Sequence, residues 1–306
     1  MNIIARRRYW YAISILLIVP GAISLALFGL RLGIDFQGGA QETVRGNVNA
    51  ERVRSLADQQ GFSDVSLVTA GGQDTIIRYR DPAPEAEREA NHQEFKAALA
   101  KEGLVEQSFD SVGPSVSGNI ARNAILSLIV ASVAIVLYIA YAFRNVPHPA
   151  KSWNFGLMAV VALLHDALLV LGVFSLLGHF FGVEVDALFV TALLTVIGFS
   201  VHDTIVVFDR IRETLRREKG DFATIVNHSI LETFARSVNT SLTVLLTLLA
   251  LLLFGGESIR LFVFALLLGI ASGTFSSIFT ASPLLVTLND YQAKRREKAS
   301  VVKSTR

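Results

Sequence analysis

The chain has 306 residues, of which 52% are hydrophobic and only 18% are charged, and its mean hydropathy is +0.48. A soluble domain of this length carries more charge, so the composition indicates a membrane protein. The formal net charge of +2 gives no indication of a nucleic-acid partner, and the lack of cysteine excludes disulfides, thiolate metal sites and thiol nucleophiles.

Six apolar segments are long enough to cross a bilayer, which takes about 20 helical residues. They run approximately over residues 9–30, 120–143, 155–177, 187–208, 238–254 and 259–288. The first follows Arg6, Arg7 and Arg8. We predict a first span rather than a signal peptide, because the segment is longer than a signal core and Ser24-Leu25-Ala26 is a weak cleavage site.

The links between these segments differ in their basic residues. The N-terminus, the second-to-third link, the fourth-to-fifth link and the C-terminal tail carry Lys and Arg, whereas residues 178–186 and 255–257 carry acidic residues and no Lys or Arg. Basic links remain in the cytoplasm, so both termini are predicted to be cytoplasmic. The predicted parts are the N-terminus with the first span (1–31), an extracytoplasmic domain (32–118), spans two to six with a charged cytoplasmic loop at 209–236 (119–288), and a basic tail (289–306).

Residues 32–118 alternate between strand and helix patterns. Strands are predicted over 39–44, 65–69, 76–80 and 104–112, and helices over 49–60 and 84–102. Asn49 is predicted to cap the first helix, Gly61 to end it, and Gly71-Gly72-Gln73-Asp74 to turn between two strands. The order βαββαβ predicts a small α+β, ferredoxin-like domain, a scaffold that specifies no function alone.

Asp203 falls within the fourth span, where an unpaired charge costs a few kcal/mol. Two interpretations are open: the carboxyl is held neutral by Ser200 and Thr204, or it exchanges a proton. A movable cation would switch an Asp between binding and releasing a proton.

Arg236, at the predicted start of the fifth span, is a candidate for that cation, but it could also be an anchor that reaches the cytoplasmic surface. The polar residues Asn239, Thr243 and Thr247 follow at helical spacing and favour a polar face shared by spans four and five.

Two His-Asp pairs, His165-Asp166 and His202-Asp203, lie inside predicted spans. We do not predict a metal site, because no Glu gives an HExxH arrangement and adjacent residues on a helix point away from each other. His165 or Asp166 is expected either to bond across the bundle or to extend a proton path.

Three further features have simple interpretations. Asp209, Arg210, Arg212 and Glu213 form either a solvated charged face or a docking surface for a partner. Gly269 and Gly273 form a GxxxG pattern that allows close helix approach. The Gly-Gly pairs lack the context of a phosphate loop.

Six groups of residues, in order along the chain, carry a resemblance to a known family. They are Gly33-Ile34-Asp35-Phe36-Gln37-Gly38-Gly39, Val112-Gly113-Pro114-Ser115-Val116, His165-Asp166, residues 196–213, Arg236-Ser237-Val238-Asn239-Thr240-Ser241, and residues 273–279 with Ala281-Ser282-Pro283. The chain resembles SecF, of the SecD/SecF protein-export membrane protein family in the resistance-nodulation-division superfamily. His202 is a departure, because relatives often carry Asn there.

The resemblance implies a protein translocase subunit of the bacterial inner (plasma) membrane that couples the proton motive force to preprotein export, with no enzymatic activity and no cofactor besides protons. The implied partners are a SecD-like subunit, the channel of SecY, SecE and SecG, the emerging preprotein and the lipid bilayer. The implied proton relay is Asp203 with Arg236, with support from His202, Asp166, His165, Ser200, Thr204 and Asn239. The family motif falls on Gly33, Asp35, Gly38, Gly39, Asp209 and Arg210.

Three alternatives remain at this point. Half of a proton-driven small-molecule or lipid exporter would need a larger exposed domain than residues 32–118 provide. A passive scaffold of the export channel would move no protons. An intramembrane hydrolase built on the His-Asp pairs would lack a nucleophile or a metal triad.

Overall fold

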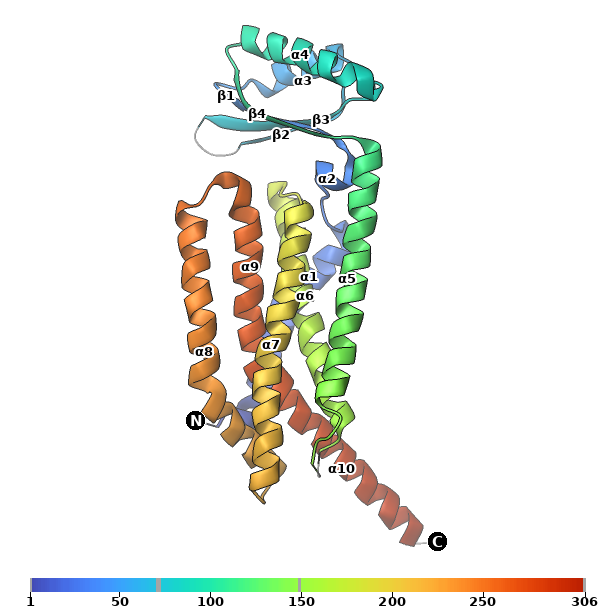
Figure 1. Ribbon diagram of the computed structural model, residues 1–306, viewed down its shortest axis with the longest axis vertical. Helices are drawn as coiled ribbons and strands as arrows, with labels where there is room; N and C mark the ends of the chain where they lie inside the picture. Colours follow the sequence, from blue (N-terminus) through green and yellow to red (C-terminus); the bar gives the residue numbers. More distant parts are fainter. Residues whose placement is uncertain (1, 70–72, 148–149, 305–306) are drawn as a thin grey trace. The chain divides into compact units, whose positions relative to one another are not determined.

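The computed structural model in Figure 1 describes residues 2–69, 73–147 and 150–304. The chain folds into two compact units. The helical unit comprises Met1–Leu30, Ser127–Phe180 and Leu188–Arg306, and the sheet unit comprises Arg31–Leu126 and Phe181–Ala187.

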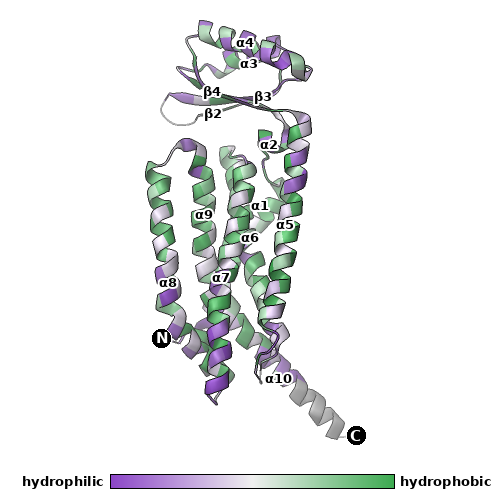
Figure 2. Ribbon diagram, viewed as in Figure 1, coloured by the Kyte–Doolittle hydropathy of each residue, from purple (hydrophilic) through white to green (hydrophobic). Residues whose placement is uncertain are grey.

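Long apolar helices make up most of the chain, as the hydropathy colours in Figure 2 show. Their bounds are η1 Ile4–Arg6, α1 Arg7–Phe28, α5 Pro114–Ala142, α6 Ser152–Phe181, α7 Ala187–Arg217, α8 Phe222–Phe254, α9 Glu257–Ser276, η2 Ser277–Ala281 and α10 Ser282–Ser304. Within the described residues, six helical segments are long and apolar enough to cross a membrane. The six predicted spans are therefore confirmed as helices of the required length.

The helices differ in how much of their apolar surface the protein itself covers. Within the most apolar 18-residue stretch of each helix, 56% of the α6 stretch and 50% of the α7 stretch is buried. The corresponding shares are 6% for α5 and 17% for α8. Apolar side chains on the outer helices are widely exposed, for example Leu16 at 73% and Phe254 at 88%. Water would penalise such a surface, so lipid is the solvent that suits it. The last span, from α9 into α10, is also 56% buried, so α6, α7 and the last span form the interior of the unit.

Glycines allow helices of this unit to approach closely. A Cβ atom on Gly21 of α1 would lie 2.7 Å from the Cα of Gly172 of α6, and one on Gly273 of α9 would lie 3.1 Å from the Cα of Ser200 of α7. The predicted close approach at Gly273 is confirmed, and it brings the backbones of α7 and α9 together beside the polar residues described below.

The last span departs from a regular helix. Residues 259–288 were expected to form one continuous helix, but the π-helical turn η2 separates α9 from α10. The hydroxyl of Ser282 donates to the carbonyl of Ser277 at 2.9 Å within this turn. Such turns insert an extra residue into a helix and are frequent at functional sites.

Most of residues 209–236, expected to be a charged loop, is helical. α7 continues to Arg217 and α8 begins at Phe222, where Asp221 caps the helix by accepting from the backbone N–H of Thr224. Phe222, Val226 and Ile230 are buried along one face of α8. The charged residues therefore lie on the other faces of helices whose apolar sides are packed, a pattern that the count of charges alone did not indicate.

The sheet unit contains a four-stranded antiparallel sheet with strand order β2-β3-β1-β4. Its elements are α2 Ile34–Gln37, β1 Gly39–Arg45, α3 Ala50–Gln59, β2 Ser63–Thr69, β3 Asp74–Arg80, α4 Glu85–Lys101 and β4 Val105–Val112. The predicted strands and helices all form, with bounds shifted by one or two residues. Asn49 caps α3 as predicted, since its side chain accepts from the N–H groups of Glu51 and Arg52. The predicted Gly71-Gly72 turn lies outside the described residues.

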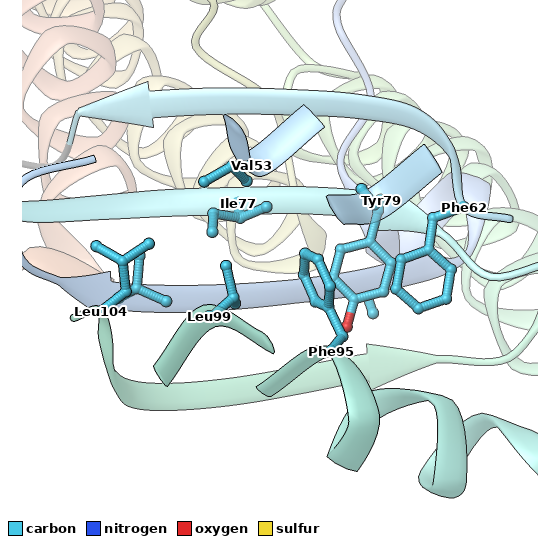
Figure 3. Close-up of a cluster of buried hydrophobic side chains, with 10 residues drawn as sticks. Val53, Phe62, Ile77, Tyr79, Phe95, Leu99 and Leu104 are labelled. Atoms are coloured by element: carbon cyan, nitrogen blue, oxygen red, sulfur yellow. The ribbon is translucent and has the colours of Figure 1, made fainter. Parts of the chain in front are cut away.

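Figure 3 shows the apolar core between the sheet and its helices. The rings of Phe62 and Tyr79 stack at 4.3 Å, and Phe95 of α4 packs edge-on against both at 5.2 Å. The Tyr79 hydroxyl donates to the buried carboxyl of Glu42 at 2.9 Å. Burial raises the pKa of both side chains above their usual values.

Residues 33–39 fix the start of the sheet. The N–H of Gly33 donates to the carbonyl of Val185 at 2.8 Å, and the carboxylate of Asp35 accepts from the N–H of Ala187 at 2.8 Å. Gly38 and Gly39 have φ of +75° and +133°, which disfavour any other residue. Gly33 and Asp35 therefore join residues 33–39 to residues 185–187, and Gly38 and Gly39 provide the backbone conformation that leads into β1.

Candidate functional site

Asp166 of α6 lies at the centre of a buried group of hydroxyls. One oxygen of its carboxylate accepts from Ser272 at 2.6 Å, and the other accepts from Ser200 at 2.5 Å and from Ser276 at 2.7 Å. The Nδ1 atom of His165 lies 2.9 Å from the first oxygen. Four short contacts thus occupy the acceptor positions of a side chain that is only 1% exposed.

Asp203 of α7 lies on the same face as Ser200, one helical turn away, and is also buried. Only one of its oxygens has hydrogen bonds among the described residues: Ser241 of α8 and Thr274 of α9 both lie 3.2 Å from Oδ2. These bonds are longer than those of Asp166 and come from two different helices.

The bond from Thr274 to Asp203 has competitors. The Thr274 hydroxyl also lies 2.6 Å from the hydroxyl of Ser241 and 3.0 Å from the carbonyl of Ile270. A hydroxyl carries one proton and can donate to only one acceptor at a time. Ser276 also has a second acceptor, the carbonyl of Gly273, but at 3.2 Å that contact is longer than its 2.7 Å bond to Asp166. The hydrogen bonding of Asp203 is therefore incomplete and exchangeable, whereas Asp166 has four shorter contacts.

Hydroxyls continue the polar group along the last span. Thr204 of α7 pairs with Ser277 at 2.8 Å, and Ser14 of α1 pairs with Thr280 at 2.9 Å. Ser277 and Thr280 belong to the π-helical turn η2. Five segments, α1, α6, α7, α8 and the last span, thus contribute polar side chains to the interior of one apolar unit. Polar groups are costly there, so their concentration marks a candidate functional site.

The expected pairing of Asp203 with Arg236 is absent from this structure. Arg236 is exposed and lies inside α8, not at its start, and no ion pair joins it to any described residue. Asn239, Thr243 and Thr247 are exposed as well. The inward face of α8 instead carries Ser237 and Ser241, so the expected polar face was assigned to the wrong side of this helix.

The two His-Asp pairs are arranged differently from each other. His165 contacts Asp166, although adjacent residues on a helix were expected to point apart. The contact is possible because both side chains can lie along the helix surface, which brings Nδ1 of His165 to the carboxylate of Asp166. His202 is exposed while Asp203 is buried, so this pair does not converge. No cluster of metal ligands forms around either pair among the described residues.

Comparison with known proteins supports one family. The family described as "Protein export membrane protein SecD/SecF, C-terminal" matches residues 93–291, and the "SecD/SecF GG Motif" matches residues 23–45. The chain belongs to the SecD/SecF protein-export membrane protein family. It is 50% identical to the protein translocase subunit SecF of Thermobaculum terrenum and 40% identical to that of Anaerolinea thermophila, covering 93% of each.

A solved structure of the SecD/SecF family resembles this one throughout. The crystal structure of SecDF, a translocon-associated membrane protein from Thermus thermophilus, matches 95% of this chain with a TM-score of 0.82 and 33% identity. The chain spans 39% of the length of that SecDF. It is thus a multi-pass membrane protein of the SecD/SecF family that corresponds to part of a longer fused chain.

Several site residues were not found from the sequence. Ser272 and Ser276 contact Asp166, and Thr274 and Ser241 contact Asp203. Ser241, Thr274 and Ser276 lie in the groups that carry the family resemblance, but none of the four was predicted to contact a carboxyl. A signal was available, because Ser272 and Ser276 are four residues apart and therefore share a helix face with each other.

Proposed function

We propose that this chain is a protein translocase subunit in which proton binding at Asp203 drives conformational change during preprotein export. The observation that carries the proposal is the incomplete hydrogen bonding of Asp203 at a buried position between α7, α8 and α9. A buried carboxyl with two long bonds on one oxygen can gain or lose a proton by rearranging few neighbours.

Protonation would change the hydrogen bonds that Asp203 can make with its neighbours. An ionised carboxylate only accepts hydrogen bonds, whereas a protonated carboxyl also donates one. Ser241 and Thr274 would then reorient, because each can act as donor or acceptor. These hydroxyls belong to α8 and α9, so each proton would alter the contacts among three helices. The membrane potential supplies about 2.3 kcal/mol per charge per 100 mV for such a step.

Arg236 enters this mechanism in a second conformation. Its exposed position on α8 leaves Asp203 without a cation in the present state. Movement of α8 that brings Arg236 to the carboxyl would favour proton release, since a nearby cation stabilises the ionised form. Asp166, with its four shorter contacts, would stay fixed and hold α6, α7 and α9 together. No cofactor other than protons is required.

A SecD-like subunit is the proposed partner. An exposed polar stripe on α8 supports this, because polar groups in a membrane span are costly against lipid. The stripe consists of Arg236, Asn239, Thr240, Thr243 and Thr247. The SecDF relative carries both halves in one chain, of which this chain matches 39%. Transporters of this general kind place their ion sites between two such halves.

We further propose the placement of the chain. The protein would span the bacterial inner membrane. Its basic links and tail favour cytoplasmic termini, with the sheet unit on the other side of the membrane. The element order βαββαβ and the strand order β2-β3-β1-β4 support a ferredoxin-like fold for that unit. There it would contact the emerging preprotein beside the channel of SecY, SecE and SecG.

The test compares Asp203→Asn with Glu257→Gln in vesicles that contain the complete export machinery. The Asp203→Asn protein should insert and fold. The gradient-dependent part of its export should fall at least about tenfold, because an amide cannot exchange a proton. Glu257 is exposed at the start of α9 and pairs with Arg260 at 3.5 Å, so its variant should export normally. Asp203→Asn protein that keeps the full gradient dependence would rule out the relay and favour a passive scaffold.

A further inference from the structure

A cluster of three ionisable side chains lies in the sheet unit, apart from the residues of the proposed proton relay. Glu42 of β1, His92 of α4 and Glu106 of β4 each place one nitrogen or oxygen atom within 4.8 Å of the other two. The side chain of Glu42 is completely buried, and those of His92 and Glu106 are 5% and 15% exposed. An ionised carboxylate at such a position is costly unless donors or cations surround it.

The two carboxyl groups lack a full set of donors. Oε1 of Glu42 accepts from the Tyr79 hydroxyl at 2.9 Å, and Oε1 of Glu106 accepts from the Lys96 amine at 3.2 Å. The Oε2 atom of each is buried and has no hydrogen-bond partner among the described residues. Buried polar atoms are normally satisfied, so two open acceptors in one small cluster need a physical cause.

The imidazole of His92 lies between the two carboxyl groups, with one nitrogen toward each. Nδ1 lies 2.9 Å from Oε1 of Glu42, and Nε2 lies 3.4 Å from Oε2 of Glu106. The ring stacks on Phe109, with the centroids 3.5 Å apart. A neutral imidazole carries one proton, so a ring that donates from Nδ1 to Glu42 turns the lone pair of Nε2 toward Oε2 of Glu106. Two acceptor atoms would then face each other in a buried position.

One further proton removes this conflict. On Nε2 it makes an imidazolium that lies between two carboxylates and is attracted by both. On Oε2 of Glu106 it makes a carboxylic acid that can donate to Nε2. The proton lies between the same two atoms in either form, so its binding belongs to the cluster and not to one residue.

The surrounding charges do not replace that proton. Among the described residues, Lys96 is the only cation besides His92 that forms an ion pair with the cluster, and it reaches Glu106 on Oε1 alone. Tyr79 faces Glu42 from β3 as a neutral phenol, because burial raises its pKa. The cavity of about 320 Å³ beside His92 is lined by two cations and two carboxylates, which offset each other: Arg80, Arg88, Asp81 and Glu89.

A β-bulge brings Glu106 to the cluster. Thr43 pairs with Ser108 but the next residue, Val44, pairs with Glu106, so Gln107 is the extra residue in β4. Without this shift, Glu106 would point to the other face of the sheet, because side chains alternate along a strand. Bulges often redirect a side chain toward a functional site.

From these observations we propose that Glu42, His92 and Glu106 form a proton-binding site outside the membrane spans, and that the bound proton fastens α4 to β1 and β4. With the proton, His92 on α4 is joined to carboxyl groups on both strands. Without it, the contact between His92 and Glu106 is repulsive and α4 is held more weakly. The packing of α4 on the sheet thus follows the pH of its compartment. The site shares no residue with the relay at Asp203, so it does not depend on that proposal.

The direction of the pH dependence follows from the pKa of Glu42, which burial raises in the folded state. A group with a raised folded-state pKa stabilises the fold fully below its unfolded pKa, which is about 4.3 for Glu. That stabilisation is lost as the pH rises through the folded-state value. The attachment of α4 should therefore be strongest in acid and weaken toward alkaline pH.

A first test measures amide hydrogen exchange of α4 in the full chain in lipid nanodiscs at pH 5 and pH 9, corrected for the intrinsic effect of pH on exchange. We expect the protection of α4 to be at least about tenfold higher at pH 5, which corresponds to one pKa unit. Glu106→Gln should keep the higher protection at both pH values, because its amide can donate to Nε2 of His92 as the bound proton does.

The matched control for hydrogen exchange is Glu94→Gln, which changes an exposed carboxylate on the same helix. Its α4 should lose protection at pH 9 as the unaltered chain does. Three results would overturn the proposal: equal protection of the unaltered chain at both pH values, a pH response retained in Glu106→Gln, or a pH response lost in Glu94→Gln.

A second test detects the proton itself by NMR of the full chain labelled with carbon-13 in its histidine rings. The ring signals of His92, identified by their absence in His92→Gln, should move between pH 5 and pH 9. In Glu106→Gln they should remain at the neutral-ring position to a pH about one unit lower. Signals that do not move in the unaltered chain would show that the cluster binds no proton in this range. That result would overturn the proposal even if α4 responds to pH through other groups.

Discussion

Asp166 and Asp203 are both buried carboxyls in the helical unit, yet the protein holds them in different ways. Asp166 receives three serine hydroxyls at 2.5–2.7 Å and the ring of His165. Asp203 has two contacts of 3.2 Å, one of which competes with other acceptors. Burial alone therefore does not identify an exchangeable carboxyl. The number and length of its hydrogen bonds distinguish a fixed group from one that can change partners.

The largest expected effect tests the fixed group. Asp166→Leu removes the acceptor of all four contacts and leaves at least the buried hydroxyls of Ser200 and Ser272 without a partner. Each unsatisfied buried group costs about 1–3 kcal/mol, so the free energy of unfolding should fall by about 3 kcal/mol. Thermal unfolding in detergent measures this loss. Asp203→Leu serves as the comparison, with an expected loss of about 1 kcal/mol or less, because Thr274 and Ser241 keep each other as partners. Equal losses at the two sites would contradict the distinction between them.

The second prediction concerns Asp203 and Arg236 as a pair. The two residues do not touch in this structure, so the stability losses of Asp203→Asn and Arg236→Met should add in the double variant. Their effects on gradient-dependent export should not add, because each removes one part of the same coupled step. A double-mutant cycle measured for both stability and export checks this. Non-additive stability would mean that the two side chains pair in the resting protein.

The third prediction compares two serines on the inward face of α8. Ser241 contacts both Asp203 and Thr274, whereas the buried hydroxyl of Ser237 has no hydrogen-bond partner among the described residues. Ser241→Ala should therefore lower the free energy of unfolding by about 1 kcal/mol. Ser237→Ala should leave it unchanged or raise it slightly. The same unfolding measurement applies to both, and a larger loss in Ser237→Ala would show that its hydroxyl has an essential partner.

The smallest effect is expected at Asp74, a partly exposed carboxylate that serves as the reference for the buried ones. Arg45 donates to both oxygens of Asp74 at 2.7 Å and 2.8 Å. The hydrogen bond from Arg45 lowers the pKa of Asp74, so the pair stabilises the folded state above the unfolded pKa of about 3.9, and this contribution disappears as the pH falls through the folded pKa.

Asp74→Asn should accordingly lower the melting temperature slightly at pH 7 and not at pH 2. Arg45→Gln should give the same small loss at pH 7, with no further loss in the double variant. A loss that persists at pH 2 would show that Asp74 acts through something other than its charge.

Much of the fold was predictable because local patterns determine it. Apolar length specified the six spans, and alternation with turn residues specified the strands of the sheet unit. Asn49 was found as a cap because its role depends only on the two or three residues that follow. The polarity of residues 209–236 was misleading, because buried Phe222 and Ile230 make much of that segment helical.

The candidate site was only partly predictable. The sequence identified Asp203 and Asp166, since an ionisable residue inside an apolar segment is visible without any structure. It could not supply the serines and threonine that contact them, because these hydroxyls also occur wherever helices pack closely. For Arg236 two interpretations were open, a partner of Asp203 or an anchor at the surface, and in this structure Arg236 is exposed and does not contact Asp203.

Local sequence patterns were enough to predict most of the helices and strands and the charges that lie among apolar residues. These properties depend on neighbours within a few positions along the chain. Only the tertiary structure decided that four contacts surround Asp166 and two reach Asp203, and that a bulge in β4 places Glu106 beside Glu42 and His92. The physical reason is that helix rotation and strand register are set by packing between distant segments, and a shift of one residue changes which side chains meet.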